Sequence, residues 1–304
     1  MLLLALELLV RVFHLHNERP ARYLDEHQVE KWVPNQTEFS VTGNRKQNVG
    51  EYRINNFGFN SIYDNYNIDP TKNNIALVGD SFIEGFHTNY TKSLGQQIEK
   101  KNANVKVLEF GYSGYDFADQ MHLIKSYNHI FKELDHVIVY LRFTDDLERD
   151  VYKKSNRLSL NTPVNKLLKK SKLIMYAKDI GLIDPIKNKT TSILSVIKGK
   201  REEALNNKKL NNDSLYLANF MSLTKEYQFN REKYTLLLDK SLCSKNFLDY
   251  LNINNYKTID INLAFNKANK PVTLIYDQHW SNYGRDLVAK SIANYLERSI
   301  NNFN

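Results

Sequence analysis

Short apolar runs alternate along the chain with longer stretches in which apolar residues recur every three or four positions. The short runs are rich in valine, isoleucine and leucine, a composition typical of buried parallel strands. We expect five such strands, at residues 75–78, 106–110, 137–141, 234–238 and 258–261. The helical spacing predicts helices at residues 94–101, 117–131 and 284–299. Strands that alternate with helices in this way predict an α/β sandwich.

Three of the predicted strands end in residues that suit a binding site. The first runs into Gly-Asp-Ser at 79–81, the second into a glycine pair at 111 and 114, and the third into the polar sequence Arg-Phe-Thr-Asp-Asp at 142–146. Glycine is expected where backbone must approach a ligand closely. Because the carboxyl ends of parallel strands lie at one edge of a sheet, we expect these three segments to converge on one site.

A histidine and a carboxylate lie far downstream and complete a possible nucleophilic site. A serine hydroxyl becomes a good nucleophile when an imidazole takes its proton and a carboxylate orients that imidazole. Asp277 and His279 are two residues apart, so in an extended segment they face the same side. The sequence therefore predicts Ser81 as nucleophile, His279 as base and Asp277 as orienting group. The plainer alternatives are an ordinary strand-to-helix turn at Ser81 and a buried structural histidine at 279.

The order of these motifs resembles the SGNH, or GDSL-like, hydrolase family, and within it the bacterial esterases and acyltransferases that modify polysaccharides. The family's four blocks are a Gly-Asp-Ser turn, a glycine turn, a Gly-x-Asn-Asp turn and a terminal Asp/His pair, and the likeness covers roughly residues 50–300. It implies a three-layer α/β/α sandwich with a five-stranded, mostly parallel, flavodoxin-like sheet. It also implies that the backbone N–H groups of Ser81 and Gly114 bind the oxyanion.

The third block departs from the family's pattern, because Phe143 and Asp145 stand where the family has glycine and its oxyanion asparagine. An ionised carboxylate has no hydrogen to donate and repels negative charge, and loss of one oxyanion donor lowers the rate by about a hundred- to a thousand-fold. Three compensations are possible: a protonated Asp145, a shifted register that uses Thr144 or Asp146, or a positive charge from Arg142. The sequence leaves all three open.

The chain divides into an apolar anchor-like segment at 1–16, an irregular lead-in at 17–70 and a hydrolase domain at 71–300 with a helical, basic insertion at about 153–230. Residues 153–209 alone carry a net charge of +11, whereas the whole chain carries +8. Apolar residues in the insertion follow a helical period, at Val164, Leu167, Leu168 and Ile174. The insertion is interpreted as a solvated helical cap or as a surface for anionic polysaccharide or lipid headgroups.

The first residues are strongly apolar, but Glu7 and Arg11 interrupt a run too short to span a bilayer comfortably. Similar bacterial SGNH proteins often carry an apolar anchor with a comparable end, which suggests that this segment is the end of an anchor. The alternative is an amphipathic helix that docks on the domain. We expect a membrane-tethered enzyme outside the cytoplasm, in the periplasm or at the cell surface.

Other chemistries find less support. Cys243 is the only cysteine, which excludes an internal disulfide and a cysteine-rich zinc site. No metal or cofactor is implied, and no nucleic-acid motif is present. His87 could line the mouth of the pocket, but a surface position is favoured. The sequence therefore predicts a serine esterase for acyl, particularly O-acetyl, esters of a small molecule or a cell-surface glycan. The alternatives are an O-acetyltransferase with the same three residues and a non-catalytic carbohydrate-binding or scaffold protein.

Overall fold

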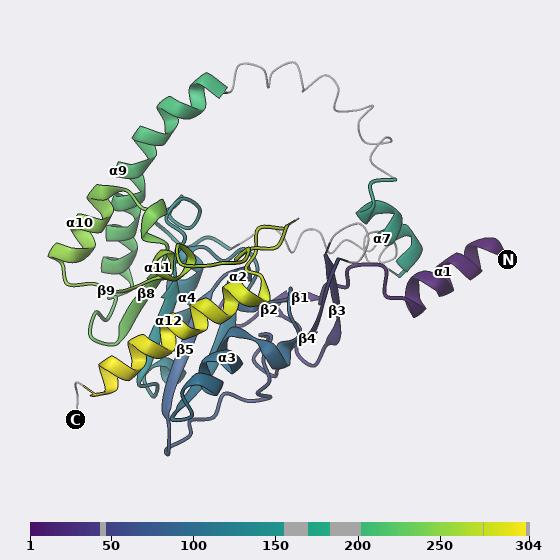
Figure 1. Ribbon diagram of the computed structural model, residues 1–304, viewed down its shortest axis with the longest axis horizontal. Coiled ribbons are helices and arrows are strands. Elements are labelled where there is room, and N and C mark those ends of the chain that lie inside the picture. The colour runs from purple at the N-terminus through teal and green to yellow at the C-terminus, as the bar shows by residue number, and fades with distance from the viewer. Residues whose placement is uncertain (43–46, 155–169, 183–201, 276, 302–304) are drawn as a thin grey trace.

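The computed structural model describes most of the chain, and Figure 1 shows its arrangement. The described residues are 1–42, 47–154, 170–182, 202–275 and 277–301. Within the insertion, Val164, Leu167 and Leu168 lie outside these residues, so the helix predicted there is described only in its final part.

Five parallel strands form the centre of the molecule. They are β5 (Asn73–Gly79), β6 (Val105–Gly111), β7 (His136–Tyr140), β8 (Tyr234–Leu238) and β9 (Lys257–Asp260). Their order in the sheet is β6-β5-β7-β8-β9, which is the flavodoxin-like order, and every pair is parallel. The predicted fold class is therefore confirmed, and each strand lies within two residues of its predicted bounds. In this order β5 and β7 are neighbours, so their carboxyl ends meet at one edge.

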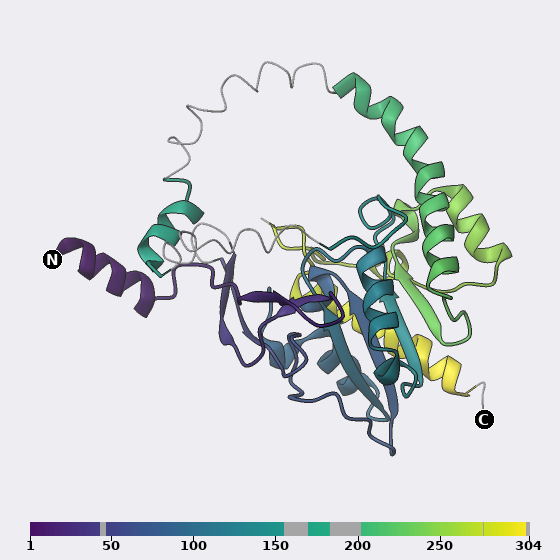
Figure 2. The same ribbon diagram turned by 180° about the vertical axis from the view of Figure 1, so that it is seen from behind.

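Helices cover both faces of this sheet, as Figures 1 and 2 show from opposite sides. The sheet has a hydrophobic core on each face, because successive side chains of a strand point to opposite faces. Ile75 and Leu77 pack with α3 and α12, whereas Ala76 and Val78 belong to the aromatic-rich core under α4, α9 and α10. The helix bounds are α2 Ser81–Glu84, α3 Leu94–Lys101, α4 Phe117–Ser126, α5 Asn128–Phe131, α9 Glu202–Glu226, α10 Lys245–Ile253, α11 Asn262–Phe265 and α12 Asn282–Asn301.

Two helix predictions differ from the structure at their ends. The helix expected at 117–131 is divided into α4 and α5 at Tyr127, whose backbone lies at φ −104° and ψ 29°. The last helix, expected at 284–299, spans Asn282–Asn301, and Trp280 just before it forms a bridge with Thr273. The Ser281 hydroxyl accepts a hydrogen bond from Gly284 N at 3.1 Å, and α12 begins at residue 282.

The segment at 17–70 is less irregular than expected, because it contains two antiparallel hairpins. The first pairs β1 (Arg22–Leu24) with β2 (Glu30–Trp32), and the second pairs β3 (Thr37–Thr42) with β4 (Asn48–Arg53). Short strands without a clear period-2 pattern gave little signal in the sequence. We call residues 17–70 the lead-in, and its two hairpins pack beside the active-site edge of the sheet.

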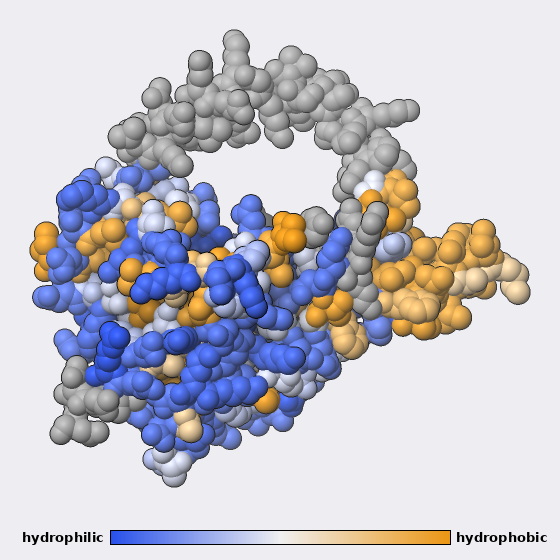
Figure 3. Space-filling model, in the orientation of Figure 1, coloured by the Kyte–Doolittle hydropathy of each residue, from blue (hydrophilic) through white to orange (hydrophobic). Residues whose placement is uncertain are grey.

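The amino-terminal helix α1 (Leu2–Val12) projects from the sheet domain and pairs with α7 (Lys172–Asp179) of the insertion. Glu7 explains this pairing, because its carboxylate accepts hydrogen bonds from Lys172 N and Leu173 N, each at 2.9 Å, at the start of α7. Most leucines of α1 remain exposed, and Figure 3 shows them as one hydrophobic surface. Among the described residues, no helix has both the length and the apolar character needed to cross a bilayer.

Candidate active site

Ser81 stands at the turn between β5 and α2, where close packing leaves no room for side chains on the neighbouring glycines. A Cβ on Gly111 would lie 2.1 Å from Glu84 N, and one on Gly79 would lie 2.4 Å from a side-chain carbon of Ile83. Asp80 caps α2 by accepting a hydrogen bond from Phe82 N at 2.9 Å. These contacts hold the first turn of α2 against the end of the sheet and place Ser81 at its rim.

Ser81, His279 and Asp277 meet in one hydrogen-bonded chain although 198 residues separate the first two. The Ser81 Oγ lies 2.7 Å from His279 Nε2, and His279 Nδ1 is bonded to Asp277 Oδ1. Gln278 has a left-handed backbone, at φ 58°, and Leu274 N donates to His279 O at 2.7 Å, so the loop folds back on itself. The structure thus brings the three predicted residues together in the order serine, histidine, aspartate, and their roles stay a prediction.

His87 joins this group, which the sequence did not predict. Its Nε2 lies 2.6 Å from Asp277 Oδ2, and its ring stacks on that of His279 with 4.0 Å between centroids. The favoured surface position for His87 is wrong, because only 12% of its side chain is exposed, and the alternative is correct, because His87 lines the pocket. Burial, together with the neighbouring His279, lowers the pKa of His87 to about 4. A histidine six residues after the serine is weak evidence of a functional role in the sequence alone. Only the fold shows that it contacts Asp277.

The third block lies at the end of β7 and surrounds an arginine with carboxylates. Arg142 Nε lies 3.0 Å from Asp80 Oδ2, and its Nη1 lies 2.9 Å from Asp145 Oδ2. Asp145 has 52% of its side chain exposed. The buried Asp146 accepts a hydrogen bond from Arg142 N at 2.8 Å and holds the turn. The guanidinium also lies 5.4 Å from the ring of Phe82, the residue after Ser81.

A second buried carboxylate, Glu84, supports the glycine turn after β6. Its Oε1 accepts hydrogen bonds from Trp32 Nε1 at 2.7 Å and from Ser113 N at 3.0 Å, and Ser113 Oγ donates to Oε2. Burial raises the pKa of Glu84 to about 7. Gly114 follows in the left-handed conformation, at φ 85°, which favours glycine. Glu84 therefore fixes the backbone next to the predicted oxyanion donor, Gly114.

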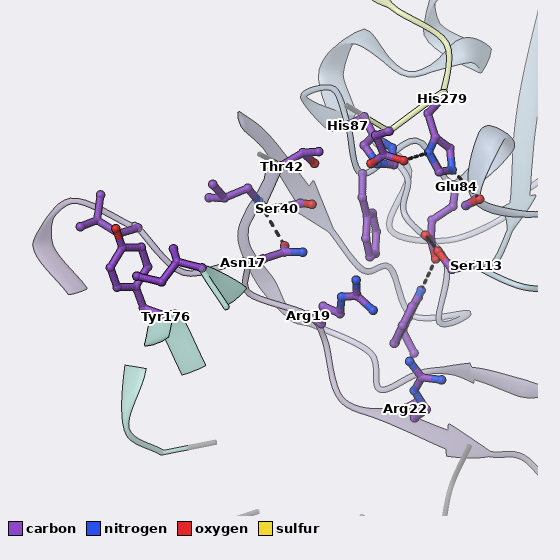
Figure 4. Close-up of a pocket in the computed structure, with 17 residues that line it drawn as sticks. Asn17, Arg19, Arg22, Ser40, Thr42, Glu84, His87, Ser113, Tyr176 and His279 are labelled. Carbon is purple, nitrogen blue, oxygen red and sulfur yellow. Dashed lines mark hydrogen bonds and ion pairs between the residues drawn. The ribbon is translucent and has the colours of Figure 1, made fainter. Parts of the chain in front are cut away.

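Two cavities meet at Ser81, His279 and Asp277. One, of about 450 Å³, has a wall built by the lead-in and α7, and Figure 4 shows His87 and His279 across it from Arg19 and Arg22. The other, of about 630 Å³, is lined by the third block, including Arg142 and Asp145, and by Trp280. Ser81 therefore has open space on two sides.

The side chains of His87, Asp277 and His279 also form a group whose possible ligand atoms all lie within 4.8 Å of one another. Two ligands bound to tetrahedral zinc at 2.0–2.1 Å lie about 3.3 Å apart. The His87 Nε2 and Asp277 Oδ2 atoms are 2.6 Å apart, which is a hydrogen-bond distance and is shorter than the separation of two zinc ligands. The described residues thus favour a hydrogen-bonded group over a metal centre.

Comparison with known proteins gives structural matches only, since no family model and no curated protein matches the chain. A lipolytic protein of the G-D-S-L family from Veillonella parvula has 11% identity, a TM-score of 0.41, and coverage of 74% of this chain and 98% of its own. The psychrotrophic esterase EstA from Pseudoalteromonas sp. has 10% identity, a TM-score of 0.42, and coverage of 76% and 100%. A catalytic mutant of an acetylxylan esterase from Geobacillus stearothermophilus has 12% identity, a TM-score of 0.37, and coverage of 73% and 93%.

The positions of the four motifs define the class of fold independently of these matches. The Gly-Asp-Ser turn follows β5, the glycine turn follows β6, the third block follows β7, and the Asp/His pair precedes α12. All four lie in loops around the two cavities. This order of motifs around one edge of a parallel sheet resembles the arrangement in SGNH/GDSL-like hydrolases.

Proposed function

We propose that this protein is a serine ester hydrolase that forms an acyl-enzyme on Ser81. The observation that carries the proposal is the 2.7 Å contact between Ser81 Oγ and His279 Nε2, with Asp277 on the other ring nitrogen. His279 takes the Ser81 proton as Oγ attacks the ester carbon, and it gives that proton to the departing alcohol. Water then attacks the acyl-enzyme with His279 again as base, which releases the acid and restores Ser81.

The oxyanion is assigned to the backbone N–H groups of Ser81 and Gly114, with Arg142 supplying positive charge. Asp145 points its carboxylate at Arg142 Nη1 and is half exposed, so we give it no donor role. The Asp146 carboxylate already accepts a hydrogen bond from Arg142 N. Of the three compensations for the missing asparagine, the guanidinium has the most support, because it lines the same cavity as Ser81 and contacts the adjacent Phe82.

For the substrate, we propose O-acetyl esters of glycans. A small acyl group and a polar alcohol suit the cavity beside the lead-in, whose lining includes Asn17, Arg19, Ser40 and Thr42. These side chains offer donors and acceptors to sugar hydroxyls, and Arg19 adds attraction for an acidic sugar. The second cavity supports a runner-up, an O-acetyltransferase, because a glycan hydroxyl bound there would take the place of water.

The decisive experiment compares the protein with its Ser81→Ala variant on p-nitrophenyl acetate, with mass spectrometry after reaction with a fluorophosphonate. We expect turnover and a single covalent adduct in the first and neither in the second. Turnover that persists without Ser81 would contradict the acyl-enzyme mechanism. A folded protein that neither turns over the ester nor reacts with the probe would support the non-catalytic glycan-binding alternative. Release of acetate from acetylated glycans, with and without an added sugar acceptor, then separates hydrolase from transferase.

We also propose that the protein works at a membrane surface outside the cytoplasm. The support is α1, on which Leu2, Leu3 and Leu4 each have more than 70% of their surface exposed. Burial of such a surface in a bilayer interface is favourable at about 25 cal/mol per Å². Sedimentation with phosphatidylglycerol vesicles tests this. A Leu3→Glu variant is expected to stay in the supernatant, and equal sedimentation of both proteins would contradict the proposal.

A further inference from the structure

The carboxylate of Asp277 is held from both sides. His279 Nδ1 bonds Oδ1, and His87 Nε2 lies 2.6 Å from Oδ2. Both hydrogen-bonding edges of the carboxylate are therefore occupied by imidazoles, and the two rings stack at an interplanar angle of 21°. A carboxylate bonded by one group alone can rotate about its last side-chain torsion, whereas a second donor on the other oxygen restricts that rotation.

The backbone of His87 is in turn held by the second lead-in hairpin. Asn48 Nδ2 donates to His87 O at 2.7 Å, and Thr88 N donates to Gly85 O at 3.1 Å in a tight turn. A Cβ on Gly50 would lie 2.5 Å from Phe86 O and 2.7 Å from Thr88 O. The hairpin thus lies directly against residues 86–88, and only glycine at position 50 permits this contact.

The hydrogen bond also sets the protonation state of His87. An ionised carboxylate accepts only, so Nε2 carries the proton, and Nδ1 is buried with no hydrogen-bond partner in the described part of the chain. Asp277 favours the charged ring, but burial, His279 and Arg285 outweigh it and lower the pKa of His87 to about 4. A neutral His87 donates one hydrogen bond to Asp277 without placing a second positive charge beside His279.

We propose that His87 is a positioning residue that fixes the Asp277 carboxylate so that Asp277 orients His279 toward Ser81. This inference rests on the proposed esterase function. His87 does not touch the reacting atoms and acts only through Asp277. Partners of this kind, which orient a functional histidine through a hydrogen bond, typically contribute about 10- to 100-fold to activity at metal sites, and we expect an effect in that range here.

The test compares four proteins: the wild type, His87→Ala, His87→Gln and His136→Gln. The glutamine amide at position 87 places an N–H where Nε2 was and should restore most of the activity. His136 is a matched control, because it is another buried histidine whose pKa burial lowers to about 4, but it lies at the amino end of β7. We expect His87→Ala to lower kcat for p-nitrophenyl acetate by 10- to 100-fold with KM nearly unchanged, and His136→Gln to leave both unchanged.

The pH profile separates positioning from a merely structural role. The charged and titratable groups that act on this site include His87, His279, Asp277, the buried Asp80 and the buried Arg285. Without the His87 donor, the Asp277 carboxylate attracts the His279 proton more strongly, so the acid limb of kcat/KM should move to higher pH in His87→Ala and return in His87→Gln. A His87→Ala variant with kcat within two-fold of wild type and an unmoved acid limb would overturn the inference.

A second readout remains informative if the esterase proposal itself fails. The proton between His279 and Asp277 should give a low-field NMR resonance in the wild type. We expect the resonance to be lost or broadened in His87→Ala and retained in His87→Gln, whether or not any ester is hydrolysed. An unchanged resonance in His87→Ala would overturn the positioning role. Absence of turnover and of fluorophosphonate labelling in the wild type would instead overturn the proposed function.

Discussion

Replacement of Glu84 by glutamine should stabilise the protein, and only at neutral to alkaline pH. Glu84 is 2% exposed, and burial raises the pKa of its carboxyl from 4.5 to about 7. The protonated form is therefore favoured in the folded state, and the stability it contributes is complete below pH 4.5 and is lost as pH rises through 7. At about 1.4 kcal/mol for each unit of pKa difference, ionisation opposes folding by on the order of 3 kcal/mol above pH 7.

The glutamine amide keeps the contacts that matter. Its oxygen can accept the bonds from Trp32 Nε1 and Ser113 N, and its NH₂ can donate to Ser113 Oγ, which accepts as readily as it donates. The side chains have nearly the same shape, so no cavity forms. What changes is the charge alone, and with it the dependence of stability on pH.

Thermal unfolding followed by circular dichroism at pH 5 and pH 8 measures the effect. We expect Glu84→Gln to unfold within about 2 °C of the wild type at pH 5 and about 6 °C above it at pH 8, at roughly 2 °C per kcal/mol. The exposed Glu148→Gln makes the same change in net charge and should show no such difference. An equal shift at both pH values, or a less stable Glu84→Gln at pH 8, would refute the reasoning.

Three further predictions concern other parts of the structure. Arg142→Gln should lower kcat for p-nitrophenyl acetate by about a hundred-fold or more with a small change in KM, and full activity would exclude its oxyanion role. Gly50→Ala should destabilise the protein by about 1–3 kcal/mol in urea unfolding and reduce activity, because its Cβ would lie 2.5 Å from Phe86 O; an unchanged midpoint would show that the hairpin yields freely. Burial lowers the pKa of His136 from 6.5 to about 4, so the stability that the neutral ring contributes should be lost as pH falls from 6.5 to 4, and His136→Gln should remove this contribution to the pH dependence in denaturant titrations.

The sheet could be predicted from the sequence because its strands are buried on both faces. Such strands are continuous apolar runs. The run at 75–78 forms most of β5, with Ile75 and Leu77 on one face of the sheet and Ala76 and Val78 on the other. The nucleophile turn and the Asp/His pair were recognisable because their chemistry needs particular residue types at particular positions. Their meeting across 198 residues followed from the parallel order of strands, since all the loops concerned lie at one edge.

The residues that support the site could not be predicted in the same way. His87 and Glu84 follow Ser81 closely and show no distinctive spacing, so the sequence gives no reason to bury either. Each is held by a hydrogen bond from the lead-in: Trp32 Nε1 donates to the Glu84 carboxylate, and Asn48 Nδ2 donates to the His87 carbonyl. Such contacts join residues 39 or more positions apart through short strands, which carry little hydrophobic pattern of their own.

The lead-in therefore does more than cover the sheet. Its first hairpin ends in Trp32, which fixes Glu84 and through it the turn that carries Gly114. Its second hairpin packs closely against residues 86–88, and His87 in that segment is hydrogen-bonded to Asp277. One hairpin thus supports the side of the site where the oxyanion would bind, and the other supports the base. Because a side chain loses conformational freedom only where its surroundings hold it, the order of the proposed catalytic groups depends on this segment as much as on the strands that carry them.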